Sequence, residues 1–234
     1  LYADISRIIL SILLYCTGNH TFLLLCFLCF FVFFFNDTAT TEIYTLSLHD
    51  ALPIFLILGI WGGWQYVKKV RIEQANLFHS AQAKLSSPAL SPKERLSQGI
   101  AALQEFAKSE SGSALSVLAL MESGKAYAQQ SKIDESITVF KEAVAHPEAN
   151  LFLRNSARLS LAALFEQQQQ WVEAEMMLES IDIASWDDVR WRALARIAIA
   201  RGELEKAKNL LEQLLEKVPD SVFRQETETL LLTL

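Results

Sequence analysis

Two of the three cysteines and the four histidines are the residues whose types most often serve redox chemistry, metal binding or catalysis. Cys26 and Cys29 are two residues apart, the spacing at which two thiolates can hold zinc or form a redox pair. They lie inside a continuous apolar run with no second pair of ligands, so neither chemistry is expected there. The histidines are scattered along the chain, and none is expected to have a partner: His20, His49, His79 and His146.

Paired carboxylates can act as general acid and base, and the sequence has two such pairs. Both stand where helices are expected to begin, and a carboxylate there interacts favourably with the positive end of the helix dipole. A structural role is therefore favoured for Asp187 with Asp188 and for Glu203 with Glu205. The sequence has no Gly-rich phosphate loop, no HExxH zinc motif and no nucleophile with a local signature. It predicts no catalytic residues, no cofactor, no metal and no small-molecule substrate, so an enzyme is the least favoured class.

The formal net charge of −6 argues against a nucleic-acid partner. Proteins that bind nucleic acid need clustered Lys and Arg to release counterions from the phosphates. The one local basic cluster is Lys68, Lys69 and Arg71, and it directly follows an apolar run. That placement is typical of the flank of a membrane segment. All three cysteines precede residue 36, so the remaining chain uses neither disulfides nor thiolate ligands, which suits both the cytoplasm and the periplasm.

The first 54 residues differ in character from the rest of the chain. A Phe-rich run ends abruptly at Asn36, and it is shorter than the roughly 20 residues that a membrane-spanning helix needs. Residues 36–54, NDTATTEIYTLSLHDALPI, resemble the translation of a common short-read sequencing adapter over their whole length, and the Phe run resembles a translated poly-T tract. The resemblance implies that residues 1–54 are a non-native segment. Glycosylation is accordingly not expected at Asn19 or Asn36, although both fit the acceptor pattern.

A membrane anchor is predicted for residues 55–67, FLILGIWGGWQYV. The segment contains Trp61, Trp64 and Tyr66 and precedes a Lys pair, an order of aromatic and then basic residues that is typical of a membrane interface. It is too short to cross a bilayer at a rise of 1.5 Å per residue, but Ala51–Ile54 lengthens the apolar run. The sequence therefore predicts one transmembrane helix, partly truncated, and a buried core helix is the alternative. The native N-terminal flank is missing, so the positive-inside rule does not fix the orientation.

The elements that would position any binding residues lie in residues 68–234. The apolar residues there recur at the spacing typical of successive α-helices. One helix is expected to run to Ser86-Ser87-Pro88. The next begins at Ser91, because Ser91, Pro92 and Glu94 form a capping box, and it ends in the Ser/Gly-rich stretch 109–113. These two helices predict a degenerate hairpin from about residue 78 to residue 109.

Three further hairpins repeat one arrangement of small and large residues. The second helices contain Ser136-x-x-x-Phe140-x-x-Ala143, Ala174-x-x-x-Leu178-x-x-Ile181 and Ala207-x-x-x-Leu211-x-x-Leu214. The first helices contain Gly124-x-x-Tyr127, Ala162-x-x-Phe165 and Trp191-x-x-Leu194-Ala195, and Gly202 stands at the third turn. These residues resemble the tetratricopeptide repeat. The resemblance implies an all-α fold: a tetratricopeptide-type helical hairpin solenoid over residues 68–234 after a single transmembrane helix, closed by a last helix at 221–234.

The repeat geometry predicts a partner-binding groove, because the first helices of successive hairpins line one face of such a solenoid. Apolar side chains beside cationic ones favour an extended or helical partner segment that carries acidic and apolar side chains. For the two arginines the alternative is an ordinary solvated helix face. The predicted groove residues are Met121, Lys125, Gln129, Leu159, Ala163, Gln167, Arg192 and Arg196.

Residues 55–234 resemble the ancillary subunit of the bacterial Sec translocon. The features that carry the resemblance are one anchor, the aromatic sequence GWQY at its end (63–66), a long helix that contains FHSAQ at 78–82, and a small repeat stack. The resemblance implies a protein-binding scaffold in the inner membrane, single-pass, with a periplasmic repeat domain that associates with the translocon and with periplasmic chaperones. Two alternatives keep the repeats and change the partners: a scaffold for cell division or envelope assembly, and a cytoplasm-facing adaptor.

Overall fold

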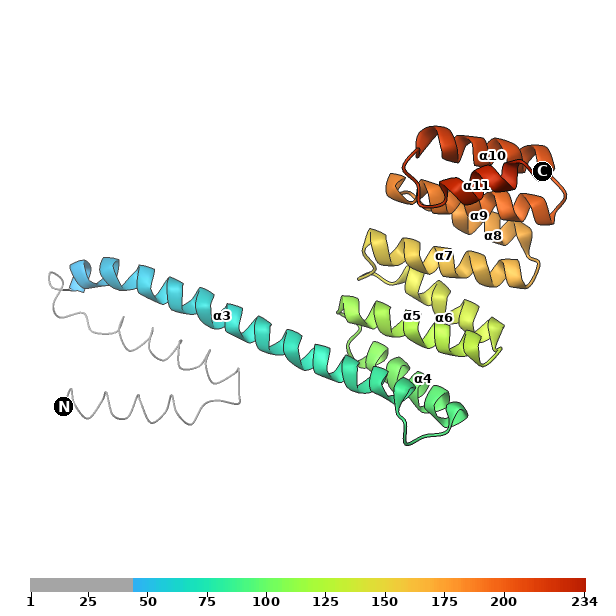
Figure 1. Ribbon diagram of the computed structural model, residues 1–234. Coiled ribbons are helices and arrows are strands. Elements are labelled where there is room, and N and C mark those ends of the chain that lie inside the picture. Colours follow the sequence, from blue (N-terminus) through green and yellow to red (C-terminus); the bar gives the residue numbers. More distant parts are fainter. Residues whose placement is uncertain (1–43) are drawn as a thin grey trace. The chain divides into compact units, whose positions relative to one another are not determined.

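The structure, a computed structural model, describes the backbone of residues 44–234 and the side chains of residues 57–234 (Figure 1). The chain divides into two units between Val67 and Lys68. Every regular element of the described part is a helix, so the predicted all-α class is confirmed there. The cysteine pair at Cys26 and Cys29 and the glycosylation patterns at Asn19 and Asn36 lie outside the described residues.

The helices follow one another in the order α3 to α11, and in the second unit each packs on its neighbours in the sequence (Figure 1). Their bounds are α3 Tyr44–Ala83, η1 Lys84–Ser86, α4 Pro92–Ser109, α5 Ala114–Gln129, α6 Ile133–Ala145, α7 Leu151–Gln167, α8 Trp171–Glu179, η2 Ala184–Trp186, α9 Asp187–Ala200, α10 Leu204–Lys217 and α11 Arg224–Leu231. Contact between sequence neighbours is the arrangement expected of a repeat solenoid, in which no hairpin can bury its apolar face alone. The predicted last helix exists but is shorter than the expected 221–234.

In the first unit, residues 57–67 belong to α3 and carry a series of large, exposed apolar side chains. They are Ile57, Leu58, Ile60, Trp61, Trp64, Tyr66 and Val67. No helix in the described part of the chain is both long enough and apolar enough to span a membrane. The anchor at residues 55–67 therefore stays a prediction.

In the second unit, α4 begins with the expected capping box. The amide of Glu94 donates to Ser91 Oγ, and the amide of Ser91 donates to the Glu94 carboxylate at 3.1 Å. The hydrogen bond from the Ser91 side chain and the one from its backbone lower the pKa of Glu94. Phe78 of α3 meets Phe106 of α4 edge to face, with ring centroids 5.7 Å apart. The predicted degenerate hairpin is therefore present, formed by the end of α3 and α4.

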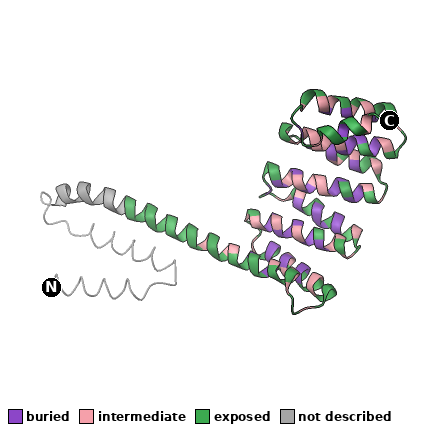
Figure 2. Ribbon diagram, viewed as in Figure 1, coloured by how far each residue is buried: buried purple, intermediate pink, exposed green. Residues whose placement is uncertain are grey.

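Small side chains lie where paired helices approach each other most closely, as the repeat pattern predicts. A Cβ atom added to Gly124 of α5 would lie 2.8 Å from Cε2 of Phe140 on α6. The hydroxyl of Ser136 donates to the carbonyl of Gly124 at 2.7 Å and ties the same two helices together. The matching residues of the later hairpins, Ala174 and Ala207, are fully buried. Figure 2 shows the buried residues on the helix faces that meet their neighbours.

Each of the three hairpins turns through one residue in the left-handed backbone region: Ser131 with φ 59°, Gln169 with φ 59° and Gly202 with φ 79°. The same hydrogen bonds close all three turns. The amide of the following residue donates back to the helix, from Lys132 to Tyr127, from Gln170 to Phe165 and from Glu203 to Ala198, at 2.8 to 3.0 Å. This is a Schellman motif, and it satisfies carbonyls at the end of the first helix. Gly202 was expected at a turn. The other two left-handed residues carry side chains and gave no signal in the sequence.

Substitutions at these turns are expected to change stability in opposite directions. A residue with a Cβ atom costs about 1–2 kcal/mol in the left-handed region. Gly202→Ala should therefore lower the free energy of unfolding by about 1 kcal/mol, and Gln169→Gly should raise it by up to about 1 kcal/mol. Urea denaturation followed by circular dichroism measures both. A loss of stability in both variants would contradict the shared turn geometry.

Candidate protein-binding surface

Acidic side chains with catalytic potential pair with basic ones in the described part of the chain. No group of three or more His, Cys, Asp or Glu side chains there is arranged to hold a metal ion. Asp187 forms an ion pair with Arg190 at 2.6 Å, and Glu203 forms one with Arg201 at 2.8 Å. These partners agree with the structural role predicted for the carboxylate pairs.

The expectation that no histidine has a partner is wrong for His146. Its Nε2 atom lies 3.1 Å from Oγ of Ser116, and its Nδ1 atom accepts a hydrogen bond from the amide of Glu148 at 3.2 Å. Because Nδ1 accepts, the proton of the neutral ring is on Nε2, which donates to Ser116. The hydroxyl of Ser116 in turn donates to the carbonyl of Ser113. The pair of His146 with fully buried Ser116 links the start of α5 to the end of α6.

An open groove with a volume of about 240 Å³ lies between α7 and α9. Four predicted residues line it: Leu159 and Ala163 from α7, and Arg192 and Arg196 from α9. The remaining lining residues are Ala162, Glu166, Leu178, Val189 and Ala193. The α7/α9 groove therefore combines apolar walls with a charged rim, a composition suited to binding a segment of another protein.

Both arginines of the α7/α9 groove already have carboxylate partners. Arg196 makes two hydrogen bonds to Glu166 across the groove, at 2.6 and 2.7 Å. These bonds raise the pKa of Arg196 above its usual value. Arg192 pairs with Glu226 of α11 and lies 4.5 Å from the ring centroid of Phe223. The carboxylates of Glu166 and Glu226 therefore offset the charge of both arginines, and the acidic partner segment that the sequence predicts would have to compete with them.

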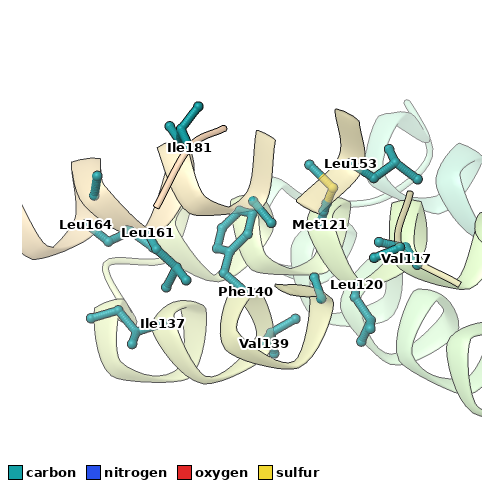
Figure 3. Close-up of a cluster of buried hydrophobic side chains, with 14 of the residues drawn as sticks. Val117, Leu120, Met121, Ile137, Val139, Phe140, Leu153, Leu161, Leu164 and Ile181 are labelled. Carbon is teal, nitrogen blue, oxygen red and sulfur yellow. The ribbon is translucent and has the colours of Figure 1, made fainter. Parts of the chain in front are cut away.

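The other predicted groove residues do not line this cavity. Met121 is only 7% exposed and packs in the hydrophobic core (Figure 3), so its predicted groove position is wrong. Lys125 is exposed and forms an ion pair with Glu122 on its own helix at 2.8 Å. Gln129 and Gln167 are exposed at the ends of α5 and α7. Whether these three residues contact a partner stays a prediction.

Sequence reasoning missed several residues that line the α7/α9 groove or pair with its arginines. Glu166 and Glu226 lie 30 and 34 residues from the arginines that they bind. Val189 and Leu178 reach the cavity from the start of α9 and from α8. A repeat pattern places residues on one helix face, but it does not give the rotation of two helices against each other. No local sequence signal could have found these pairs.

The stacked hairpins, their shared turns and the small residues between paired helices define a helical-repeat protein. The sequence pattern of the tetratricopeptide repeat-like domain family matches residues 46–217. The chain belongs to this family. No functionally curated protein matches the chain.

Solved structures of tetratricopeptide repeat proteins resemble the chain at low sequence identity. A tetratricopeptide repeat protein from Parabacteroides merdae is 15% identical, with a TM-score of 0.52 over 67% of this chain and 59% of that protein. MamA from Desulfovibrio magneticus RS-1 is 17% identical, with a TM-score of 0.49 over 68% of this chain and 81% of its own. The likeness to the Parabacteroides merdae protein supports the tetratricopeptide-type fold. Such folds are typically non-enzymatic scaffolds that bind other proteins, and this role fits the present chain.

Proposed function

We propose that this protein is a scaffold that holds a segment of a partner protein in the α7/α9 groove. The observation that carries the proposal is the cavity itself, which four residues predicted from the repeat pattern help to line. Its walls are apolar at Leu159, Ala163 and Val189. An apolar side chain of a bound segment would be buried there, and the arginines and glutamates of the rim would offer hydrogen bonds to its polar flanks.

The ion pair between Arg196 and Glu166 determines which partner the groove accepts. A bidentate pair of this kind joins the two helices and leaves both groups with capacity for further hydrogen bonds. Partner segments with a single strong charge would have to compete with this pair. A segment with an apolar anchor and uncharged polar flanks is therefore the best fit to the groove.

We further propose that the scaffold acts at a membrane, as an ancillary subunit of a Sec translocon or of a periplasmic chaperone network. The exposed apolar and aromatic side chains of residues 57–67 support attachment to a bilayer, because such a series is costly to leave in water. Lys68, Lys69 and Arg71 follow directly, in the order expected at an interface. The alternative roles are a scaffold for cell division or envelope assembly and a cytoplasm-facing adaptor. Either would use the same groove to bind a different partner.

Filling the α7/α9 groove should abolish partner capture without unfolding the chain. Ala163 is exposed and lines the cavity, so Ala163→Arg would place a long side chain in the groove at little cost to the core. Ala101→Arg is the matched control, because Ala101 is exposed on α4, away from the groove. The measurement is photo-crosslinking from position 159 of the full chain in native membranes, with adducts identified by mass spectrometry.

We expect adducts with a translocon or chaperone subunit in the control and at least a roughly tenfold loss in Ala163→Arg. Equal adduct yield in the two variants would place the binding surface elsewhere. Adducts with division or assembly proteins would keep the scaffold and replace the proposed partner. Recovery of the chain in the soluble fraction after extraction at high pH would overturn the membrane attachment.

A further inference from the structure

A second cavity, of about 250 Å³, lies between α6 and α8 and shares no residue with the α7/α9 groove. Leu161 and Phe165 of α7 are buried beneath it. The helices on either side contribute Val144 and Lys141 from α6, and Glu173, Met176 and Met177 from α8. We refer to this site as the α6/α8 pocket.

The apolar surface of the α6/α8 pocket continues onto the exposed face of α8. Met176 lines the pocket and is 58% exposed, and Val172, one turn earlier on the same helix, is 60% exposed. Residues four apart on a helix share a face, so these two side chains form a short apolar stripe. Methionine is flexible and polarisable, and it adapts to apolar partners of different shape. The stripe and the pocket together offer two neighbouring apolar contacts.

The two helices that border the α6/α8 pocket are strongly acidic. Their acidic residues are Asp134, Glu135, Glu142, Glu173, Glu175 and Glu179, and their single basic residue is Lys141. The Nζ atom of Lys141 lies 5.5 Å from the ring centroid of Phe165, so this cation is directed over an aromatic face. Glu175 alone is neutralised by cations from outside the two helices, at 3.0 Å from Arg201 and 2.7 Å from Lys206. Glu173 lines the pocket beside Lys141, and Glu179 lies on the same face of α8 as Val172 and Met176, so acidic side chains border the apolar contact on α8.

We propose that the α6/α8 pocket binds a cationic amphipathic helix of a partner protein. A Leu, Met or Phe side chain of that helix would enter the pocket, and the next apolar residue would contact Val172 and Met176. Lys or Arg side chains on the flanks of the helix would meet Glu142, Glu173 and Glu179. The same acidic surface would repel an anionic membrane, so a protein helix fits the site and a lipid surface does not. This second surface would let the scaffold hold two partners at once.

A designed amphipathic peptide of Leu and Lys, with a benzophenone at a central apolar position, tests the proposal. The peptide is irradiated with the full chain in a neutral detergent, and the crosslinked residues are mapped by mass spectrometry. We expect adducts at Met176 or Met177, and weaker crosslinking at higher ionic strength because exposed charges are screened. A peptide of Leu and Glu with the same length controls for apolar binding alone, and equal crosslinking by the two peptides would overturn the proposal.

Two pairs of substitutions separate this site from the rest of the surface. Glu173→Lys with Met176→Ala should lower crosslinking by at least roughly tenfold. Glu212→Lys with Val222→Ala makes the same charge reversal and also shortens an apolar side chain, at exposed positions outside the pocket, and it should leave crosslinking within about twofold of the unaltered chain. Circular dichroism establishes that both variants are folded. Unchanged crosslinking in the first pair, or loss of crosslinking in Ala163→Arg, would show that the peptide binds elsewhere.

Discussion

Replacing Phe140 with alanine is expected to lower the free energy of unfolding by about 3–5 kcal/mol. Phe140 is only 2% exposed and lies in the cluster that Figure 3 shows, where α5, α6 and α7 contribute its neighbours. Its removal would leave a cavity between helices whose positions are fixed by other contacts, so the loss exceeds the transfer free energy of the ring alone. Urea denaturation of the full chain, followed by far-UV circular dichroism, measures the change.

Phe152→Ala is the matched control for this prediction. Phe152 is 59% exposed, and its ring meets the ring of Trp186 edge to face, with centroids 5.3 Å apart. Such a pair contributes about 0.5–1.5 kcal/mol beyond the buried area. We therefore expect the control to lose less than half of the stability that Phe140→Ala loses. Similar losses in the two variants would mean that Phe140 does not lie at the centre of the hairpin contact.

Gly124→Leu is expected to lower the free energy of unfolding by about 3 kcal/mol through overpacking. A Cβ atom at this position would already be 2.8 and 2.9 Å from two ring carbons of Phe140, which is itself buried in the core. The cost arises although leucine has a higher helix propensity than glycine. Gly112→Leu is the control, because a Cβ atom added at Gly112 meets nothing within 4 Å. Thermal and urea denaturation of both variants are the measurements.

Combining Gly124→Leu with Phe140→Ala tests whether the two residues form one contact. The leucine would occupy part of the space that the ring vacates, so the double variant should be more stable than the sum of the single losses implies. Residues in contact show interaction free energies of about 0.5–3 kcal/mol in such cycles, and we expect a value in this range. Strict additivity of the two losses would contradict the close approach of α5 and α6 at this point.

The losses of stability in these variants should be confined to the substituted hairpin and its neighbours, because each helix of the second unit packs on the helices next to it in the sequence. In a repeat solenoid the stability is close to a sum over hairpins and the interfaces between them. A variant at Gly124 is therefore expected to weaken the α5–α6 hairpin and to leave the α9–α10 hairpin less affected. The α7/α9 groove, which begins one hairpin later, would keep its geometry in variants that are still folded.

Local chemistry allowed the hairpins to be predicted from the sequence. The capping box at Ser91 marks the start of α4 because it satisfies amides of the first turn within four residues. The spacing of Ser136 and Phe140, and of Ala174 and Leu178, follows the helical period, so the small and large sides of each second helix could be assigned without a structure. The same helical period placed Leu159, Ala163, Arg192 and Arg196 on one face, and these four residues line the α7/α9 groove.

The features that the sequence did not predict depend on how separate helices are rotated and stacked against one another. Met121 occupies a predicted groove position, yet the stacking of α5 against its neighbours turns it into the core. The partners of Arg192 and His146 lie 34 and 30 residues away, and no pattern of period 3.6 encodes such a pairing. The left-handed turns at Ser131 and Gln169 likewise arise because the second helix must return against the first. The sequence by itself determined the helices, their small and large faces and the family of repeats. Only the tertiary structure decided which charges are neutralised and which apolar side chains remain open to a partner, because these depend on contacts between helices.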